Sequence, residues 1–403
     1  MDIRAVTADE VERFLKVDYT SFGVTPVAEQ IDDTSAHVEL DRTVAVFDGD
    51  AIVATAGSFT FELTLPGLTL SPAAGVTWVS VLPTHRRHGL LRRMMAFQLD
   101  DIARRGEPVA ILTASEAPIY GRFGYGCATW AYDVKVQRAR SAFHAPVADD
   151  GRVRLVDAET ARKVIPSVFD GSRRLLPGDH QRTEGFWDYW FLDRERWREG
   201  ASARFYAVHE TAAGEADGFV AYRIKQSWSD HGIPNGELVV SDFSTTSPTA
   251  RAALWQYLFG VDLVDRVQAH LPPDESLRWL LADPRAIEVN AVVDDIWCRV
   301  LDVEAALSAR GYAGEGRLVL EVTDDFRPQG SGRYLLDGGR CTRTDADADL
   351  ALSVDALGSI YLGGVRPSTL ATAGRITELK PGALAVADAL FLSPTQPFSQ
   401  THF

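Results

Sequence analysis

Apolar and polar residues in the first third of the chain alternate between a strand-like and a helix-like repeat. Arg42–Leu63 contains two β-rich runs on either side of an Asp-Gly-Asp turn, which predicts a β-hairpin. Ala74–Pro83 predicts another strand, and Pro108–Ser115 a short buried one. In Gly89–Gly106, apolar residues recur at helical spacing before a terminal glycine. These elements predict a mixed α/β fold.

The chain continues with a short predicted helix, Ala117–Phe123, and a strand within Gly124–Gln137 that we expect to be the last of the first domain. The polar stretch His144–Arg152 contains Pro and Gly and predicts a linker or surface loop. A Pro-rich turn, His270–Leu277, lies inside the next domain. We therefore expect three domains, at residues 1–145, 146–290 and 291–403.

Composition narrows the functional classes. The 403 residues suggest two or three domains. The net charge of −15 disfavours a nucleic-acid partner and suits cationic small molecules or basic peptides, although acidic charge also simply favours solubility. The three cysteines are far apart, so no disulfide framework and no metal site is predicted. No signal peptide and no apolar run of roughly 20 residues is found, so we expect a cytoplasmic protein without a membrane span, with secretion not excluded.

A basic strand–loop–helix segment is the strongest chemical signal. The strand ending at Val81 runs through Pro83–Arg93 directly into a helix. Unpaired backbone N–H groups and the helix dipole at such a start bind phosphate, and Arg86, Arg87 and Arg92 add positive charge. No Gly-Lys-Ser/Thr and no G-x-G-x-x-G follows, which argues against an ATP P-loop and a dinucleotide fold. Taken alone, the segment is equally compatible with an ordinary basic helix start.

Two motifs in the correct order favour the phosphate interpretation. Arg86-x-x-Gly89-x-Leu91 resembles the Q/R-x-x-G-x-G/A pyrophosphate loop of GNAT acetyltransferases, which bind acetyl-CoA, with Leu91 in place of Gly or Ala. Further along, "IYGRFGY" resembles the Y-x-x-x-G-F segment of that superfamily. Tyr120 takes the tyrosine position, and Tyr125 takes the position of the phenylalanine.

A narrower resemblance runs along the whole chain. "PTHRRHGLL", "ASEAPIYGRFGYG", "RGYAGEG", "LGSIYLGGVRPSTLATAGR" and the terminal Phe403 are similar to the enhanced intracellular survival (Eis) family. The resemblance implies tandem GNAT-like domains, the second degenerate, followed by a sterol-carrier-like domain. It also implies a hexameric, acetyl-CoA-dependent N-acetyltransferase that modifies amines, including those of aminoglycosides.

The resemblance also assigns residues. Tyr120 is the expected general acid, and the C-terminal carboxylate of Phe403 is the expected general base. The expected cofactor-binding residues are Val79, Ser80 and Val81 beside the pantetheine and acetyl carbonyl; Arg87, His88, Gly89, Leu90, Leu91 and Arg92 around the pyrophosphate; and Ser115 and Glu116 after the next strand.

The chemistry of acyl transfer is consistent with these assignments. A backbone N–H near Val81 can polarise the thioester carbonyl, and a phenol with a pKa of about 10 can protonate the leaving thiolate. A carboxylate can take the proton of the attacking amine. Because an α-carboxylate has an ordinary pKa of about 3.5, it needs a raised pKa or a water relay to act as a base. Tyr125 is the competing acid, and we favour Tyr120 because Tyr125 begins the next strand as a packing residue.

Further residues have both a functional and a structural interpretation. His85 and His88 are candidate bases, with phosphate-facing or solvated positions favoured. Asp32 and Asp33 are candidates for holding a cationic substrate, with a solvated loop as the favoured alternative. The aromatic run Glu184–Trp197 is a candidate amine cage, with packing favoured.

The second and third domains have predicted supporting roles. Ser247 and Pro248 predict an N-cap and first helical residue in a strand–loop–helix that lacks glycine, so we expect no cofactor there. The third domain is expected to deliver the extended tail Ser393–Phe403 to the first, and lipid binding is its alternative role. A protein-lysine or polyamine acetyltransferase and a non-catalytic acetyl-CoA or lipid sensor remain as alternative functions.

Overall fold

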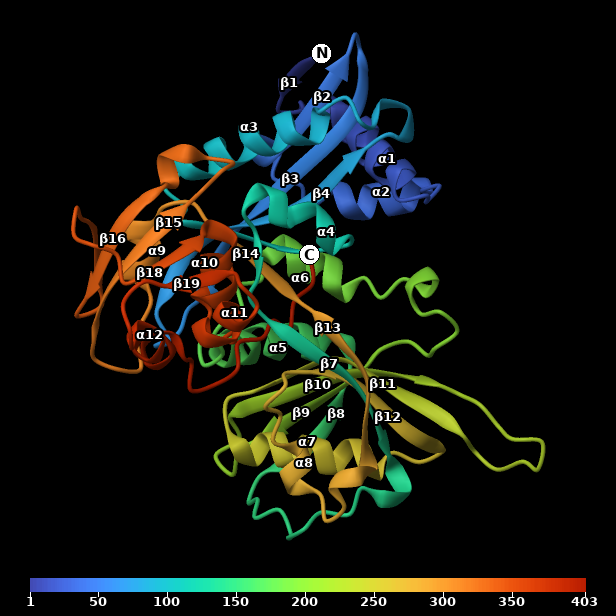
Figure 1. Cartoon of the computed structure of the whole chain (residues 1–403). Helices are drawn as coiled ribbons and strands as arrows, with labels where there is room; N and C mark the ends of the chain where they lie inside the picture. Colours follow the sequence, from blue (N-terminus) through green and yellow to red (C-terminus); the bar gives the residue numbers. More distant parts are fainter. The chain divides into compact units, whose positions relative to one another are not determined.

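The computed structural model describes all 403 residues, which form two compact units (Figure 1). The first unit comprises Met1–Thr129, Asp294–Pro397 and His402–Phe403. The second unit comprises Trp130–Val293 and Phe398–Thr401. The N-terminal segment of the first unit therefore ends at Thr129, before the expected boundary at residue 145. No helix of the chain combines the length and the apolar composition that crossing a membrane requires.

A seven-stranded sheet forms the centre of the first unit, in the order β1-β2-β3-β4-β5-β14-β6. β4 and β5 are parallel neighbours, and their pairing ends at Gly75 and Ile111 although both strands continue. The two strands therefore diverge and leave a wedge between their C-terminal halves. The strands of this sheet are β1 (Asp2–Arg4), β2 (Val44–Asp48), β3 (Ala51–Thr64), β4 (Leu70–Val81), β5 (Val109–Thr113), β6 (Gly126–Cys127) and β14 (Ile296–Val300).

Helices cover this sheet and confirm the predicted α/β alternation. The expected helix is α3, which buries Met95, Leu99 and Ile102. The predicted hairpin is β2–β3, and the short helix after β5 is α4, extended by a 3-10 turn at Gly121–Phe123. The helices of this part are α1 (Val11–Ser21), α2 (Ala28–Ser35), α3 (Leu90–Arg104) and α4 (Ala117–Tyr120).

A bulge distorts β4 beside the wedge. The register between β3 and β4 shifts between Thr55 and Gly57, and Trp78 of β4 has a φ of 52°. A side chain at Gly57 would collide with the Trp78 indole, because its Cβ would lie 2.5 Å from Trp78 Cε3. Left-handed backbone is costly for a bulky residue, so the packing around Trp78 holds this strained bulge in place.

Two strands lie in sheets that local sequence patterns did not indicate. The strand expected to complete the first domain is β7, and it pairs with β12 in the second unit. The first sheet is completed by β14, which lies between β5 and β6. Strand partners depend on contacts far apart in the chain, so a local run of β-formers does not reveal them.

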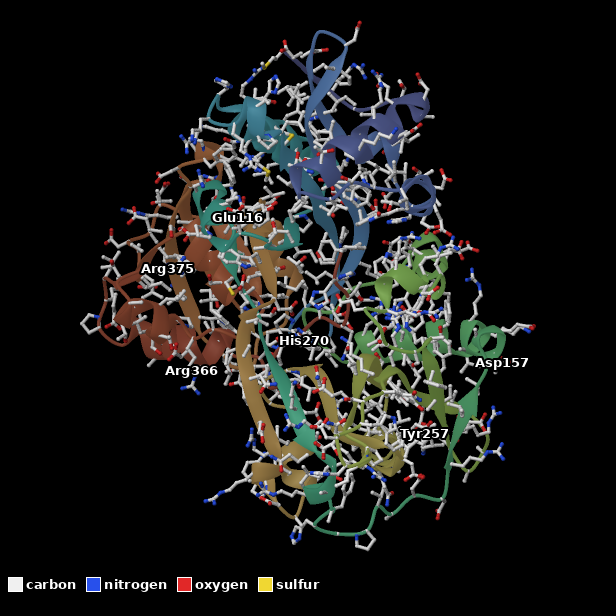
Figure 2. The ribbon with its side chains drawn as sticks, turned by 90° about the vertical axis from the view of Figure 1, so that its right-hand side faces the viewer. Glu116, Asp157, Tyr257, His270, Arg366 and Arg375 are labelled. Atoms are coloured by element: carbon white, nitrogen blue, oxygen red, sulfur yellow. The ribbon has the colours of Figure 1, made fainter.

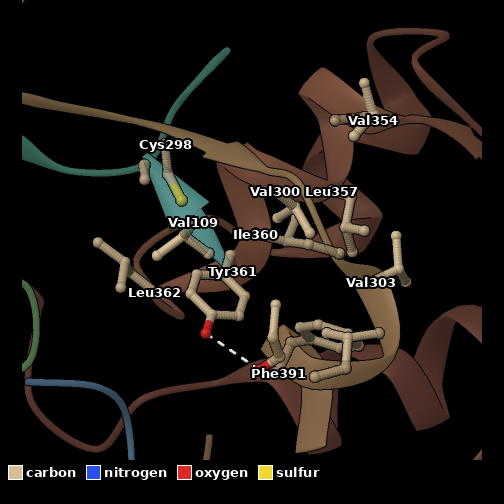
Figure 3. Packing of buried hydrophobic residues seen from close by; sticks show 14 of the residues in the cluster. Val109, Cys298, Val300, Val303, Val354, Leu357, Ile360, Tyr361, Leu362 and Phe391 are labelled. Atoms are coloured by element: carbon tan, nitrogen blue, oxygen red, sulfur yellow. Dashed lines mark hydrogen bonds between the residues drawn. The ribbon is translucent and has the colours of Figure 1, made fainter. Parts of the chain in front are cut away.

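A five-stranded sheet in the order β17-β16-β15-β18-β19 forms the C-terminal part of the first unit. Its helix α10 packs against β14, where Cys298 and Val300 meet Leu357 and Ile360 in one buried cluster (Figure 3). The first sheet and this part therefore share a hydrophobic core. Its elements are α9 (Val303–Ala309), β15 (Arg317–Thr323), β16 (Gly332–Asp337), β17 (Arg340–Arg343), β18 (Leu350–Ser353), α10 (Val354–Tyr361), α11 (Pro367–Thr372), β19 (Ile376–Glu378) and α12 (Ala383–Phe391).

The second unit contains another seven-stranded sheet, in the order β13-β7-β12-β11-β10-β9-β8. Asp157 caps α5, and Tyr257 of α7 is hydrogen-bonded to Tyr222. Figure 2 labels Asp157 and Tyr257. Ser247 accepts a hydrogen bond from the Ala250 N–H, which confirms the predicted N-cap of α7. The elements are β7 (Trp130–Gln137), β8 (Arg152–Val156), α5 (Ala158–Arg173), α6 (Glu184–Phe191), β9 (Phe205–Glu210), β10 (Ala216–Lys225), β11 (Gly236–Thr245), α7 (Pro248–Gly260), β12 (Val264–Leu271), α8 (Leu277–Leu280) and β13 (Ile287–Asp294).

Candidate functional site

A pocket of about 570 Å³ opens in the first unit at the wedge between β4 and β5. Its walls are the end of β4, the loop into α3 and the segment after β5, which begins beside Glu116 (Figure 2). The end of α1 adds Ser21 and Phe22. Of the predicted site residues, Val79, Ser80, Val81, Arg87, Gly89, Leu90, Leu91, Arg92, Ser115, Glu116 and Tyr120 line this pocket.

The start of α3 has the geometry of an anion site. Gly89 is its N-cap with a φ of 75°, and Arg87 before it has a φ of 67°. An added Cβ at Gly89 would meet no atom within 4 Å, so the glycine is required by its backbone conformation rather than by space. The first-turn N–H groups have no partner within the helix, and they and the helix dipole favour a negative ligand.

Arginines give the pocket a local charge opposite to that of the whole chain. Arg86, Arg87, Arg92 and Arg122 line it, and Glu116 is its single lining carboxylate. Arg86 also fixes the loop, because its guanidinium donates to Val81 O at 3.3 Å and to Ser21 O at 3.5 Å. In a chain of net charge −15, this concentration of positive charge favours a phosphorylated ligand at this position.

Three residues of the loop, His85, His88 and Leu91, have different surroundings. His88 is exposed and is not among the residues that line the pocket. His85 does line it, and its ring lies 3.7 Å from the Asp48 carboxylate. Leu91, which replaces the usual Gly or Ala, packs against two buried apolar clusters as well as the pocket. Its side chain therefore contributes to the packing under α3.

The two tyrosines of the "IYGRFGY" segment, Tyr120 and Tyr125, have different environments. Tyr120 lines the pocket, whereas Tyr125 is fully buried and does not. Burial, followed by the nearby charges of Asp18 and Glu116, raises the pKa of Tyr120 to about 12. Burial also raises the pKa of Tyr125. At neutral pH the Tyr120 phenol is therefore protonated and able to donate.

The last residue of the chain lies at the end of β5 in the first unit. The Thr113 hydroxyl donates to the O atom of Phe403 at 3.3 Å. The Phe403 ring stands edge-on to Phe61, with centroids 5.0 Å apart. It also lies close to Gly75, whose added Cβ would be 3.1 Å from it. Phe403 is not among the residues lining the pocket. Its hydrogen-bond partner Thr113 lies two residues before Ser115, which does line it.

Within the second unit, the tail residues before Phe403 bind to a buried ionic cluster that no sequence motif indicated. Arg182 donates to Thr401 Oγ1 at 2.7 Å and to Gln400 O at 3.1 Å, and it pairs with Asp242 at 2.5 Å. Asp179 accepts from Ser399 Oγ and Gln400 N, each at 3.3 Å. Burial raises the pKa of Asp179 to about 7, although Arg182 opposes the rise. The tail is therefore held two residues before its end.

Asp18 was not among the candidates predicted from the sequence, and Asp32 and Asp33 were candidates for which a solvated loop was favoured. The segment of Asp32 and Asp33 is helix α2 rather than a loop, and neither residue lines the pocket. Asp18 is buried on α1, three and four residues before the pocket residues Ser21 and Phe22. This helical spacing on α1 was the available signal.

The aromatic run of the second unit is a packing element, as favoured. Trp187 is buried in a cluster with Phe169, and their rings meet edge-on with centroids 5.4 Å apart. The faces of this cluster are covered by arginines of the same unit. Arg182 lies 3.9 Å from the Phe169 centroid, and Arg204 lies 4.2 Å from that of Trp190.

Three family models match successive parts of the chain. Residues 2–128 and 178–300 each match an acetyltransferase (GNAT) domain, and residues 303–400 match a sterol carrier protein domain. The two GNAT-type matches and the following sterol-carrier match agree with the fold predicted from the sequence.

The chain is also similar to proteins along its full length. It is 40% identical over 404 residues to an uncharacterized N-acetyltransferase of Streptomyces avermitilis, covering 98% of each chain. It is 37% identical over 371 residues to the N-acetyltransferase Eis of Mycobacterium tuberculosis, covering 88% of each chain. The solved structure of Eis1 from Mycobacterium abscessus superposes with a TM-score of 0.89 at 35% identity, covering 100% of both chains.

Proposed function

The chain belongs to the Eis family of GNAT N-acetyltransferases, whose co-substrate is acetyl-CoA, and we propose that it acetylates amino groups of cationic small molecules, aminoglycosides among them. One observation supports this proposal above the others. The pocket combines an anion-binding helix start with a protonated Tyr120 at the point where two parallel strands diverge.

The walls of the wedge supply contacts for the two halves of acetyl-CoA. The N–H groups of Leu90, Leu91 and Arg92 at the start of α3 would hold the pyrophosphate, with Arg87 beside them. Beyond Gly75, β4 has no partner on the side of β5, so half of its backbone groups there are available. The pantetheine amides would extend along Val79–Val81 as a strand does.

The acyl transfer then needs three functions. An N–H of β4 near Val81 would polarise the thioester carbonyl as the amine nitrogen attacks it. The C–N bond forms and the C–S bond breaks, and Tyr120 donates its proton to the departing thiolate of CoA. The attacking nitrogen loses a proton, which the Phe403 carboxylate accepts directly or through water.

The second GNAT-type domain is proposed to bind no cofactor. At the start of α7, Ser247 Oγ donates to the Asp217 carboxylate at 2.7 Å. A carboxylate at this position repels a phosphate, and the loop contains no glycine. Titration calorimetry of the full chain should therefore give one acetyl-CoA site per chain; two sites would contradict this assignment.

We further propose a homohexamer working in the cytoplasm. Family membership supports the assembly, and three free cysteines fit a reducing compartment. Light scattering on the purified protein tests the assembly; a mass of one or two chains would contradict it.

A thiol-release assay tests the function. The protein is supplied with acetyl-CoA and a panel of aminoglycosides, polyamines and basic peptides. Faster CoA release with aminoglycosides than with the other amines supports the proposal. Release with only polyamines or peptides would reassign the acceptor, and release with none would contradict an amine acetyltransferase.

A further inference from the structure

Asp18 is a buried carboxylate without a cation beside it. We propose that Asp18 binds an ammonium group of the acceptor and so selects cationic amines. This inference rests on the proposed function and names the residue of the chain that recognises the charge of that substrate.

Asp18 lies next to residues that line the pocket. It lies on α1 one helical turn before Ser21 and Phe22, which line the pocket, so all three residues share a helix face. The hydroxyls of Ser80 and Thr55 are hydrogen-bonded to its carboxyl group. Ser80 itself lines the pocket on β4. Asp18 itself is not among the residues that line the pocket, but its carboxyl group lies next to Ser80, which is.

The hydrogen bonding of Asp18 is incomplete. Its side chain belongs to a residue that is 7% exposed, and its Oδ1 atom is buried without a hydrogen-bond partner. The Ser80 and Thr55 hydroxyls lie 2.7 Å apart, and Thr55 also donates to Trp78 O at 2.9 Å. Two hydroxyl protons thus serve the carboxylate, a carbonyl and each other. A buried polar atom left without a partner is unfavourable, and a donor on the ligand would satisfy it.

Three other buried carboxylates of the chain each pair with an arginine. Glu107 pairs with Arg42 at 2.7 Å, Asp242 with Arg182 at 2.5 Å and Asp324 with Arg299 at 2.6 Å. Asp18 forms no such ion pair. A buried carboxylate is stable as an ion when a cation and hydrogen bonds compensate for lost water, so the missing partner of Asp18 is a cation.

The titratable groups around Asp18 do not supply that cation. From the segment after β5, the acid nearest in effect is Tyr120, whose pKa is raised by burial and by the charges of both Asp18 and Glu116. From β3 and β4 it faces the hydroxyls of Thr55 and Ser80. Burial raises the pKa of Asp18 to about 6, and the two hydroxyls oppose the rise. The carboxyl group is therefore mostly ionised above pH 6 and ready to pair with an ammonium group.

Asp18→Asn separates recognition from folding and from cofactor binding. Kanamycin serves as the polycationic probe, and its affinity for the CoA-loaded protein is measured by titration calorimetry at pH 8. We expect affinity to fall on the order of 10-fold or more, as for loss of a charge-assisted hydrogen bond. The affinity for acetyl-CoA and the Tm should change little. Asp32→Asn, which removes the same charge from an exposed site outside the pocket, is the matched control.

The pH dependence gives a second readout that a purely structural role would not move. Wild-type affinity for kanamycin should fall as the pH drops from 7.5 to 5.5, and Asp18→Asn should remove the part of this fall due to Asp18. Asp18→Ser repeats the comparison if the Asn variant does not fold. Equal kanamycin affinity in wild type and variant, or no binding to the wild type, overturns the inference. Binding without CoA release would instead contradict the proposed function.

Discussion

The rings of Tyr120 and Tyr125 meet edge-on, with centroids 5.9 Å apart and planes inclined by 73°, yet Tyr120 alone lines the pocket. One ring thus supports the other, and the two hydroxyls face different surroundings. The Tyr125 hydroxyl is buried without a hydrogen-bond partner.

The two phenylalanine variants should therefore behave differently. Tyr120→Phe removes the proposed acid and should lower kcat on the order of 10²-fold or more. Tyr125→Phe removes a hydroxyl that has no partner, so kcat and Tm should stay near those of the wild type. Steady-state kinetics and thermal unfolding of both variants provide the comparison, and a larger kcat loss in Tyr125→Phe would reverse the assignment.

The glycines at the two ends of α3 allow a matched test of the anion site. Gly89 and Gly106 have φ values of 75° and 78°, and an added Cβ at either would meet no atom within 4 Å. Alanine at either position should cost about 1–2 kcal/mol of unfolding free energy, since both force left-handed backbone. Calorimetry with acetyl-CoA should show a loss of affinity for Gly89→Ala alone. Equal affinities for the two variants would argue against phosphate binding at this helix start.

The role of the C-terminal carboxylate can be tested separately from that of the Phe403 ring. Deleting Phe403 moves the carboxylate away from Thr113, and kcat should fall on the order of 10²-fold if this group accepts the proton. Phe403→Leu keeps the carboxylate while removing the ring contact with Phe61, so it should retain most of the activity. Unchanged turnover after the deletion would remove Phe403 from the mechanism.

Asp179 should make the stability of the protein depend on pH. Its pKa in the folded state is about 7, above the ordinary value near 3.9, so the native state binds more protons between these two values. The free energy of unfolding therefore decreases as the pH rises from about 4 to about 7. Asp179→Asn cannot ionise, so its Tm relative to wild type should increase over that range. A Tm difference that is constant with pH would show that Asp179 is already ionised in the native protein.

Many of the residues that line the pocket belong to motifs that local sequence patterns indicated. Gly89 and Tyr120 belong to short contiguous motifs, and the backbone around each follows from neighbouring residues. The delivery of Phe403 to the first domain was expected only from the family resemblance, and its hydrogen bond with Thr113 was not predicted. Leu91 fits because its side chain packs under α3, which a motif comparison does not show.

Long-range relationships were less accessible. β14 (Ile296–Val300) completes a sheet whose other strands precede residue 128. β7 lies in the second seven-stranded sheet, although the strands before it in the chain belong to the first. Asp18 shows the same limit on a smaller scale. An aspartate on an amphipathic helix looks like a solvated residue until β3 and β4 bring Thr55 and Ser80 against it. Such contacts depend on tertiary packing rather than on local propensity.

The most direct test of the central claim is the rate of CoA release from acetyl-CoA by the full chain, measured with and without kanamycin and followed by mass spectrometry of the amine. For an aminoglycoside N-acetyltransferase, CoA release should saturate with kanamycin, and acetylated kanamycin should form in equal amount. Release no faster than acetyl-CoA hydrolysis, with kanamycin and every other amine of the panel unmodified, would contradict it.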